Sequence, residues 1–201
     1  MQQLIKQVVF IGGIHGVGKS TICASLKEKF GWVVVKQRKL LIEVGQAMGL
    51  GWPEVADYHD ILINQVADRL IDALQLGNRQ VLLVDCHYAI PSSVALRSHG
   101  SRAKFIPNLD WRLVKRVKQE FQSKFVLLEV DPKMALNRIE LRTEATHYEN
   151  TLEYFQAEAV AEKDIFLQLI SQFNVSPCDF LCLEPIEVEQ TVNQLNIFIN
   201  S

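Results

Sequence analysis

The sequence predicts an α/β fold in which a parallel sheet carries helices on both faces. Five apolar runs are rich in β-branched or aromatic residues, and none alternates cleanly with polar residues, which is typical of strands buried on both faces. These runs are Val8–Gly12, Trp32–Val35, Val81–Asp85, Phe125–Val130 and Asp179–Leu183. Segments with helical spacing alternate with them, namely Lys19–Phe30, Arg38–Met48, Tyr58–Leu76, Pro132–Arg142, Leu152–Phe173 and Val188–Ile199. Because right-handed crossovers place such helices on both faces, the alternation predicts a doubly wound, three-layer domain.

Local signals support individual helices in chain order. Ile22, Leu26 and Phe30 are spaced four apart, so they share one face of the first helix. The segment Tyr58–Leu76 has a strong helical period and is followed by Gly77, a common residue just past a helix end. No repeat, low-complexity run or long linker divides the chain, so we expect one domain over residues 1–201.

Composition and charge narrow the classes of function. The net charge of −2 argues against a general nucleic-acid or membrane-surface binder, and the longest apolar runs are too short to span a bilayer. The first residues run into a glycine-rich loop without a secretory signal, so we expect a cytoplasmic protein with reduced cysteines. Cys178 and Cys182 lack the further partners of a metal site and are interpreted as small buried thiols.

The most specific feature is the glycine-rich loop after the first predicted strand. It matches the nucleotide-binding pattern G-x-x-x-x-G-K-[ST] and stands between a strand and a helix, as that pattern requires. Backbone N–H groups of such a loop, together with the N-terminus of the next helix, surround phosphate oxygens. The expected ATP-binding residues are Gly13, Ile14, His15, Gly16, Val17, Gly18, Lys19, Ser20 and Thr21.

Side chains of this loop have separate expected roles. Lys19 should reach the β- and γ-phosphates, Ser20 should bind Mg²⁺, and Thr21 is a candidate contact for the α-phosphate. His15 should contribute mainly its backbone, with a catalytic side chain as the less favoured alternative.

A carboxylate and an imidazole follow the third strand. Asp85 ends the apolar run, and the carboxyl ends of parallel strands converge on the ligand crevice. Asp85 can therefore meet the glycine-rich loop and hold Mg²⁺ together with Ser20. A helix- or turn-capping role for Asp85 is the alternative. His87 is either a contact for the phosphoryl acceptor or a structural histidine.

Another group of residues follows the fourth strand. Asp131 before Pro132 predicts a helix N-cap. Arg138 and Arg142 are then one turn apart, and the residues after them are polar and unpatterned. We expect a short lid at about residues 138–150, in which the two arginines neutralise charge on the moving phosphoryl group. Alternatively, Arg142 pairs with a neighbouring glutamate on the surface.

Two later segments complete the expected structure. The helix Leu152–Phe173 is interpreted as core-facing, with an acidic outer face. The stretch Glu184–Ile186 leaves the last strand at the ligand edge, where its backbone could contact adenine.

The loop Gly13–Thr21, the stretch from Val84 to His87 and the passage from Asp131 to Arg142 together resemble the adenylate kinase-like nucleoside monophosphate kinases, especially their compact archaeal-type branch. The resemblance implies a five-stranded parallel sheet of order 2-3-1-4-5, a helical acceptor-binding arm at about residues 36–76 and the short lid. It also implies ATP with Mg²⁺ as the phosphoryl donor and a nucleoside monophosphate as the acceptor.

Basic residues near the strand ends are candidates for binding the acceptor. Seven basic residues and one acidic residue lie between Arg97 and Lys118. This segment is either a solvated face or a wall for a phosphate-bearing ligand, and we expect only its first half to reach the site. The expected acceptor-binding residues are Arg38, His87, Arg97 and Arg102.

Three functions stay open from the sequence. In a nucleoside monophosphate kinase, the expected catalytic residues are Lys19, Asp85, Arg138 and Arg142, and positioning with charge neutralisation needs no strong base. A kinase for a nucleoside or another small hydroxyl compound would use Asp85 or His87 as its base. An ATP-dependent switch or assembly factor with slow hydrolysis would instead contact a macromolecule through the basic segment. Neither kinase reading calls for a membrane or a nucleic acid as partner.

Overall fold

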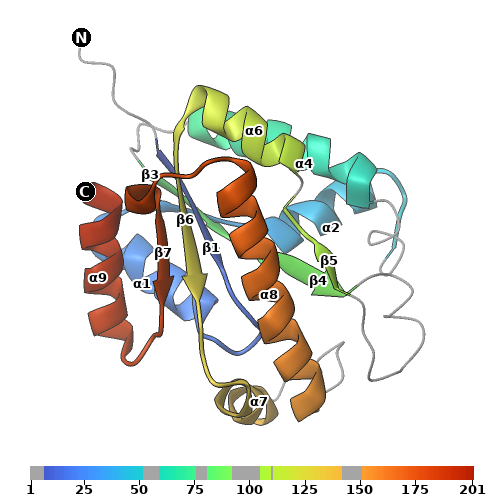
Figure 1. Ribbon diagram of the computed structural model, residues 1–201. Coiled ribbons are helices and arrows are strands. Elements are labelled where there is room, and N and C mark those ends of the chain that lie inside the picture. The colour runs from blue at the N-terminus through green and yellow to red at the C-terminus, as the bar shows by residue number, and fades with distance from the viewer. Residues whose placement is uncertain (1–6, 52–58, 76–80, 92–104, 110, 142–150) are drawn as a thin grey trace.

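A computed structural model describes residues 7–51, 59–75, 81–91, 105–109, 111–141 and 151–201 of the chain, which form a three-layer α/β domain (Figure 1). The central sheet has the order β2-β3-β1-β6-β7, and every neighbouring pair is parallel. Its strands are β1 Gln7–Gly12, β2 Val33–Lys36, β3 Val81–Asp85, β6 Gln122–Leu128 and β7 Phe180–Leu183. The predicted fold class is confirmed. The predicted strand order 2-3-1-4-5 is confirmed as well, because β4 and β5 lie outside this sheet and β6 and β7 are therefore its fourth and fifth strands along the chain.

Helices cover both faces of the sheet, and β1 shows how the two cores arise. Val8 and Phe10 face one core, which includes residues of α2, α4, α6 and α8, whereas Val9 and Ile11 face the other, which includes residues of α1, α7 and α9. The helices are α1 Lys19–Phe30, α2 Gln37–Ala47, α4 His59–Gln75, α6 Trp111–Glu120, α7 Pro132–Glu140, α8 Leu152–Gln172 and α9 Val188–Asn200, with a 3₁₀ turn η1 at Pro177–Asp179. Successive side chains of a strand point to opposite faces of the sheet, so the apolar residues of β1 contribute to the cores on both faces.

Strand β6 begins three residues before the predicted apolar run. Gln122 pairs with Gln7 at the start of the ladder, so the strand includes polar residues that an apolar-run criterion leaves out. One of them, Lys124, is only 1% exposed. Its ammonium group donates a hydrogen bond of 2.6 Å to the carbonyl oxygen of Phe198 and lies 4.7 Å from the centre of the same residue's ring. A buried lysine thus joins the sheet to α9.

Two short strands were not predicted. β4 Ala89–Pro91 and β5 Phe105–Pro107 form a separate antiparallel pair. Each has three residues and ends in proline, which is too short to show periodicity and carries a residue that normally marks turns or sheet edges. Their pairing places Ala89–Pro91 beside Phe105–Pro107.

Helix α6 carries the later half of the basic segment between Arg97 and Lys118. α6 buries Leu113, Val114 and Val117 and exposes basic side chains, so the later half of the basic segment is a solvated helix face as expected. The exposed basic residues are Arg112, Lys115 and Arg116.

The prediction of buried thiols at Cys178 and Cys182 is wrong, because both are exposed. Cys182 lies on β7, the edge strand of the sheet, where one side lacks a neighbouring strand. Within the described part of the chain, no helix is both long and apolar enough to cross a membrane.

Candidate functional site

The glycine-rich loop joins β1 to α1 at the carboxyl end of the sheet. Gly13 and Gly16 have φ angles of 137° and 80°. A Cβ atom at Gly13 would lie 2.4 Å from the carbonyl oxygen of Leu128, and one at Gly16 would lie 2.6 Å from that of Ala135. The loop therefore packs so closely on β6 and α7 that only glycine fits at both positions.

Charged and hydroxyl side chains meet inside this loop. The Lys19 ammonium donates hydrogen bonds to the carbonyl oxygens of Gly13 and Ile14, the latter at 3.0 Å. The Ser20 hydroxyl donates to Asp85 at 2.8 Å, which joins the start of α1 to the end of β3. This hydroxyl and carboxylate line the same pocket and are the hard oxygen donors that Mg²⁺ prefers, so the pair fits the ion.

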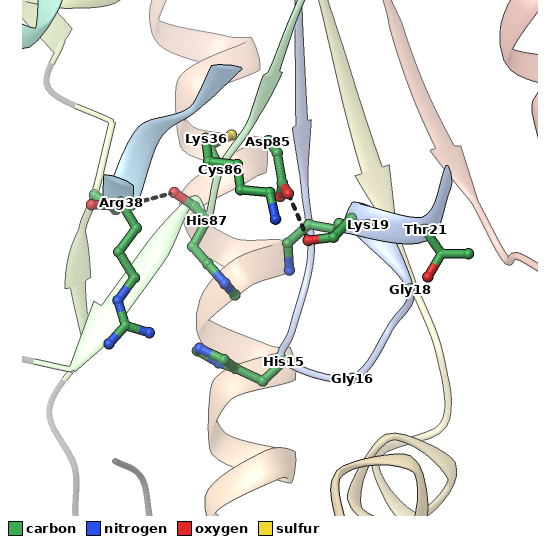
Figure 2. Close-up of a pocket in the computed structure, with 12 residues that line it drawn as sticks. His15, Gly16, Gly18, Lys19, Thr21, Lys36, Arg38, Asp85, Cys86 and His87 are labelled. Carbon is green, nitrogen blue, oxygen red and sulfur yellow. Dashed lines mark hydrogen bonds between the residues drawn. The ribbon is translucent and has the colours of Figure 1, made fainter. Parts of the chain in front are cut away.

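A pocket of about 290 Å³ lies over the strand ends (Figure 2). Lys36, at the end of β2, is paired with Asp85 in the β2–β3 ladder, and Arg38 follows it at the start of α2. The Lys36 side chain reaches toward Asp85 and Lys19, whereas Arg38 lies on the opposite side of the pocket from them (Figure 2). The lining residues are His15, Gly16, Gly18, Lys19, Ser20, Thr21, Lys36, Arg38, Asp85, Cys86, His87 and Asn108. The pocket thus has the glycine-rich loop, Asp85 and Lys36 on one side and Arg38 on the other.

A second cavity of about 370 Å³ lies on the other side of the same loop. Its lining combines loop residues with the segment between β7 and α9, and it shares Gly16, Gly18 and Thr21 with the first pocket. The lining residues are Gly16, Val17, Gly18, Thr21, Ile22, Arg138, Pro185, Ile186, Glu187 and Val188. Two cavities therefore meet at one loop, an arrangement that suits an elongated ligand such as a nucleotide.

Arg138 projects from α7 onto the loop. Its guanidinium donates to the carbonyl oxygens of Gly16 and Val17, each at 3.4 Å. α7 begins as predicted, because the Asp131 carboxylate accepts a hydrogen bond of 2.7 Å from the backbone N–H of Lys133. The cap fixes the start of the helix that carries the arginine toward the phosphate loop.

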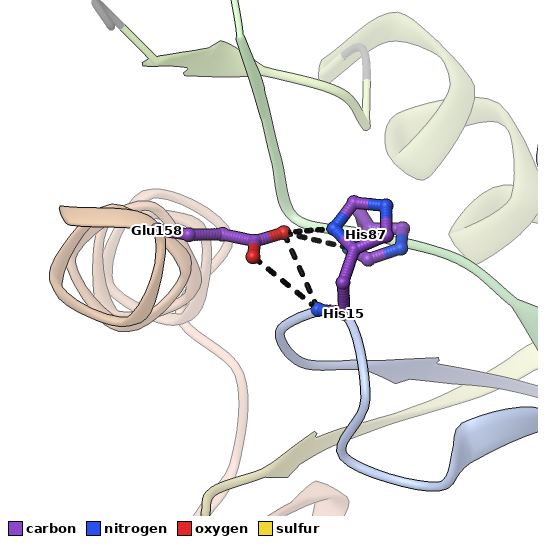
Figure 3. A group of neighbouring side chains, drawn as sticks. All are labelled: His15, His87 and Glu158. Atoms are coloured by element: carbon purple, nitrogen blue, oxygen red, sulfur yellow. Dashed lines mark hydrogen bonds and ion pairs between the residues drawn. The ribbon is translucent and has the colours of Figure 1, made fainter. Parts of the chain in front are cut away.

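Helix α8 contributes two acids that the sequence analysis assigned to its outer face. That prediction is wrong for Glu158 and Glu162, which are 0% and 1% exposed. Both Glu158 oxygens accept from the backbone N–H of His15 at 3.3 Å, and one also contacts the Nδ1 atom of the His15 ring (Figure 3). The loop histidine therefore uses its ring as well as its backbone.

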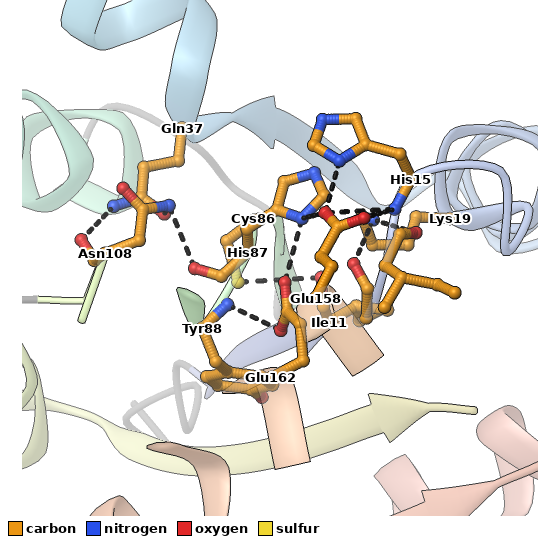
Figure 4. Close-up of polar contacts among 12 residues, drawn as sticks. Ile11, His15, Lys19, Gln37, Cys86, His87, Tyr88, Asn108, Glu158 and Glu162 are labelled. Carbon is orange, nitrogen blue, oxygen red and sulfur yellow. Dashed lines mark hydrogen bonds and ion pairs between the residues drawn. The ribbon is translucent and has the colours of Figure 1, made fainter. Parts of the chain in front are cut away.

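The second acid reaches the loop after β3 (Figure 4). Glu162 contacts the Nδ1 atom of His87 at 2.8 Å and accepts a hydrogen bond from the backbone N–H of Tyr88, also at 2.8 Å. The rings of His15 and His87 stack with their centres 4.2 Å apart. One face of α8 thus holds two loops whose imidazoles touch.

The charge state of this network follows from its burial. Burial raises the pKa of Glu162 to about 8, and Glu158 acts in the same direction while Lys19 opposes it. Burial also lowers the pKa of His87 well below its usual value of 6.5, and the cations Lys19 and Arg38 act in the same direction. At neutral pH the contact between Glu162 and His87 therefore holds one proton, not two.

The same residues raise the question of a metal centre. Ligand atoms of His15, His87 and Glu158 all lie within 4.8 Å of one another. However, the two imidazole planes are only 23° from parallel, and a lone pair on an imidazole lies in the plane of its ring. Two stacked rings cannot direct these lone pairs at one ion 2.0–2.1 Å away, so the arrangement suits shared protons better than a metal.

Tyr88 and Asn108 form the floor behind the pocket. The Tyr88 hydroxyl donates to the carbonyl oxygens of Phe10 and Val126, at 3.2 Å and 3.0 Å. A Cβ atom at Gly12 would lie 2.2 Å from the Tyr88 ring, so this glycine makes room for the tyrosine. The Asn108 amide donates to the carbonyl oxygen of His87 at 2.9 Å. The turn that carries His87 is thereby fixed from below.

Comparison with known proteins assigns the family. A family model described as an AAA domain matches residues 9–161. The chain belongs to this family. No curated protein sequence matches it.

Solved structures share the fold of this AAA domain at low sequence identity. Deoxyadenosine kinase from M. mycoides superposes with a TM-score of 0.56 at 17% identity, covering 96% of this chain and 98% of the other. A gluconokinase from Sinorhizobium meliloti 1021 gives 0.56 at 13% identity, covering 99% and 94%. Shikimate kinase from Aquifex aeolicus gives 0.55 at 13% identity, covering 96% of each chain. The AAA domain therefore has the fold of small P-loop kinases.

Most predicted site residues of the AAA domain lie around the two cavities. The first pocket joins loop residues to Asp85, His87 and Arg38, and Arg138 lies at the second. Three predicted residues, Arg97, Arg102 and Arg142, lie outside the described residues, as does most of the predicted lid. Four further residues around these cavities were not predicted as site residues, namely Lys36, Asn108, Glu158 and Glu162.

Proposed function

We propose that the chain is a phosphotransferase that moves the γ-phosphoryl group of ATP to a small, phosphate-bearing acceptor with the help of Mg²⁺. The observation that carries this proposal is the two-sided first pocket. Lys19, Ser20 and Asp85 form its donor side with Lys36 next to them, while Arg38 supplies a positive charge on the opposite side. Nucleoside monophosphates are the acceptor class we favour.

On the donor side, the chain's own groups bind and orient the triphosphate. Loop N–H groups and Lys19 would hold the β- and γ-phosphates, and phosphate oxygens would replace the loop carbonyls that Lys19 now contacts. Ser20 and Asp85 would hold Mg²⁺, which when bound neutralises charge on the phosphates. Arg138 adds a positive charge next to the loop, where it can stabilise the transition state.

On the acceptor side, charge favours an anion. Lys19, Lys36 and Arg38 supply three cationic groups to a pocket in which Asp85 is the one carboxylate among the described lining residues. A phosphate acceptor is already ionised, so transfer to it requires alignment more than a base.

A hydroxyl acceptor is the second candidate, and one observation favours it. The His87 ring lines the pocket while its Nδ1 atom contacts the Glu162 carboxylate. If Glu162 is ionised and the neutral His87 ring donates from Nδ1 to it, the other ring nitrogen has a free lone pair, and a carboxylate-oriented imidazole of this kind serves as a general base elsewhere. In this case Asp85 or His87 would accept the hydroxyl proton.

The test is release of ADP in a coupled assay with ATP, Mg²⁺ and each nucleoside monophosphate, nucleosides and sugar acids being assayed in parallel. We expect turnover with at least one monophosphate well above hydrolysis without acceptor. Lys19→Met should abolish that turnover, and Arg38→Gln should raise the KM of the acceptor about tenfold with little change in the KM of ATP. If ATP binds and no monophosphate exceeds background, the monophosphate assignment is wrong, and turnover with a hydroxyl compound would support the second candidate.

A further inference from the structure

The glutamates of α8 lie where they can set the geometry of both sides of the pocket. Glu158 and Glu162 are one helical turn apart, so their side chains share a face. Glu158 contacts the phosphate loop through His15, and Glu162 contacts the loop after β3 through His87 and Tyr88. One helix, α8, therefore connects the glycine-rich loop, which is the proposed donor loop, to the loop after β3, which is the proposed acceptor loop.

The stacked imidazoles of His15 and His87 link the contact made by Glu158 to the contact made by Glu162. The His15 and His87 ring centres are 4.2 Å apart, and His87 Nδ1 lies 3.8 Å from Glu158 as well as 2.8 Å from Glu162. Figure 3 shows both rings with their second nitrogen on the side away from Glu158. Because both histidines line the first pocket, that nitrogen is presented to the ligand side.

Stability alone is a weak reason for this arrangement. A buried carboxylate loses its hydration, and replacing a buried ionic cluster by well-packed apolar residues is often neutral or stabilising. Both acids are at most 1% exposed, at positions of α8 that apolar side chains occupy elsewhere along the same face. What the acids add, and apolar residues could not, is a fixed orientation of two rings and of two backbone N–H groups.

We propose that Glu158 and Glu162 are positioning residues for phosphoryl transfer, which together hold the phosphate loop and the acceptor loop in one register. The proposal rests on the proposed function and goes beyond it, because it assigns a task to residues outside the nucleotide-binding motif. Neither glutamate touches ATP or the acceptor in this scheme. Each acts through a histidine at the border between the two sides of the pocket.

Conservative amide variants test the proposal. Glu158→Gln and Glu162→Gln keep the size of the side chain and part of its hydrogen bonding, whereas Asp164→Asn makes the same change at an exposed site of α8 and is the matched control. We expect Glu162→Gln to lower kcat/KM for the acceptor by about tenfold or more, since small misalignments are costly in transfer reactions, while the Kd of an ATP analogue changes less than about threefold. Asp164→Asn should match the unmodified chain in both measurements.

The double variant separates joint positioning from two independent structural effects. If the two glutamates act as one unit, Glu158→Gln with Glu162→Gln should lose little more activity than the worse single variant, because the register is already lost. Multiplying losses would overturn the proposal. So would losses that disappear at a lower temperature where each variant is fully folded.

A measurement without turnover keeps the proposal testable if the proposed function fails. Hydrogen exchange of backbone amides should be about tenfold faster in the phosphate loop of Glu162→Gln, although that glutamate contacts only the other loop. Unchanged exchange at residues 15–18 would overturn the coupling of the two loops, whatever the acceptor. Faster exchange without phosphotransfer would retain the coupling and reject the kinase assignment.

Discussion

The shared proton between Glu162 and His87 makes a quantitative prediction about stability. The native pair binds one proton up to about pH 8, because burial raises the pKa of Glu162 to about 8 and lowers the pKa of His87 below 6.5. In the unfolded chain the carboxyl ionises near 4.5 and the imidazole near 6.5. Just below pH 6.5 the unfolded imidazole binds a proton that the native imidazole does not, so there the native and unfolded chains carry equal numbers of protons on this pair.

The native and unfolded chains bind different numbers of protons on this pair between pH 6.5 and 8. There the native pair keeps its proton and the unfolded pair has lost it, so the free energy of unfolding must fall as the pH rises. The slope is about 1.4 kcal/mol per pH unit, which gives about 2 kcal/mol over this interval. Lys19, His15, Arg38 and Glu158 face the pair and set these values, but they are unchanged in a variant that alters Glu162 alone.

Urea unfolding at pH 6.5, 7.5 and 8.5 measures the effect. The unmodified chain should lose about 2 kcal/mol across this range relative to Glu162→Gln, since glutamine cannot release a proton. Asp164→Asn is the control and should follow the unmodified chain. The comparison stops at pH 8.5 because burial raises the pKa of Cys86, which would add a loss of the same sign near pH 9. Equal slopes in the unmodified chain and Glu162→Gln would refute the shared proton.

Three further predictions concern single contacts. Gly12→Ala places a Cβ atom 2.2 Å from the Tyr88 ring, so urea unfolding should show a loss of about 2 kcal/mol or more; an unchanged midpoint would contradict that packing. Asp85→Asn removes a charge from the proposed Mg²⁺ pair, so titration of activity with Mg²⁺ should require about tenfold more ion, and an unshifted titration would remove Asp85 from the metal site. Asp131→Ala removes the N-cap of α7 and should lower the free energy of unfolding by about 1 kcal/mol, measured with Lys133→Ala as a neighbouring control.

The sheet and the phosphate loop could be predicted because their signals are local. Strands buried on both faces are largely apolar, and the loop needs glycine at fixed places for steric reasons. Gly13 and Gly16 show this directly, since a Cβ atom at either would collide with a backbone carbonyl oxygen. The meeting of Asp85 with Ser20 also follows from local signals, because parallel strand ends share one edge.

Features that depend on distant partners were not predictable in this way. β4 and β5 are three residues each and are strands only because they pair with each other across the intervening chain. Lys124 is buried because the end of α9 supplies a carbonyl oxygen and an aromatic ring more than seventy residues away. Lys36 faces a pocket that exists only after β2 has paired with β3.

The acids of α8 stand between these two cases, because a signal for them was present in the helical phase. Phe155, Glu158, Glu162, Phe166 and Leu169 follow one another at spacings of three and four, and all five are buried. Assigning every acid to the outer face ignored this phase. A carboxylate inside an otherwise apolar stripe needs polar partners. This stripe contains two such carboxylates, one helical turn apart. Their position alone therefore predicts polar loops across from this part of α8, and the loops found there carry His15 and His87. The candidate site is consequently built by the nucleotide-binding motif together with the loop after β3 and helix α8, in addition to the residues from α2 and α7 that line its cavities.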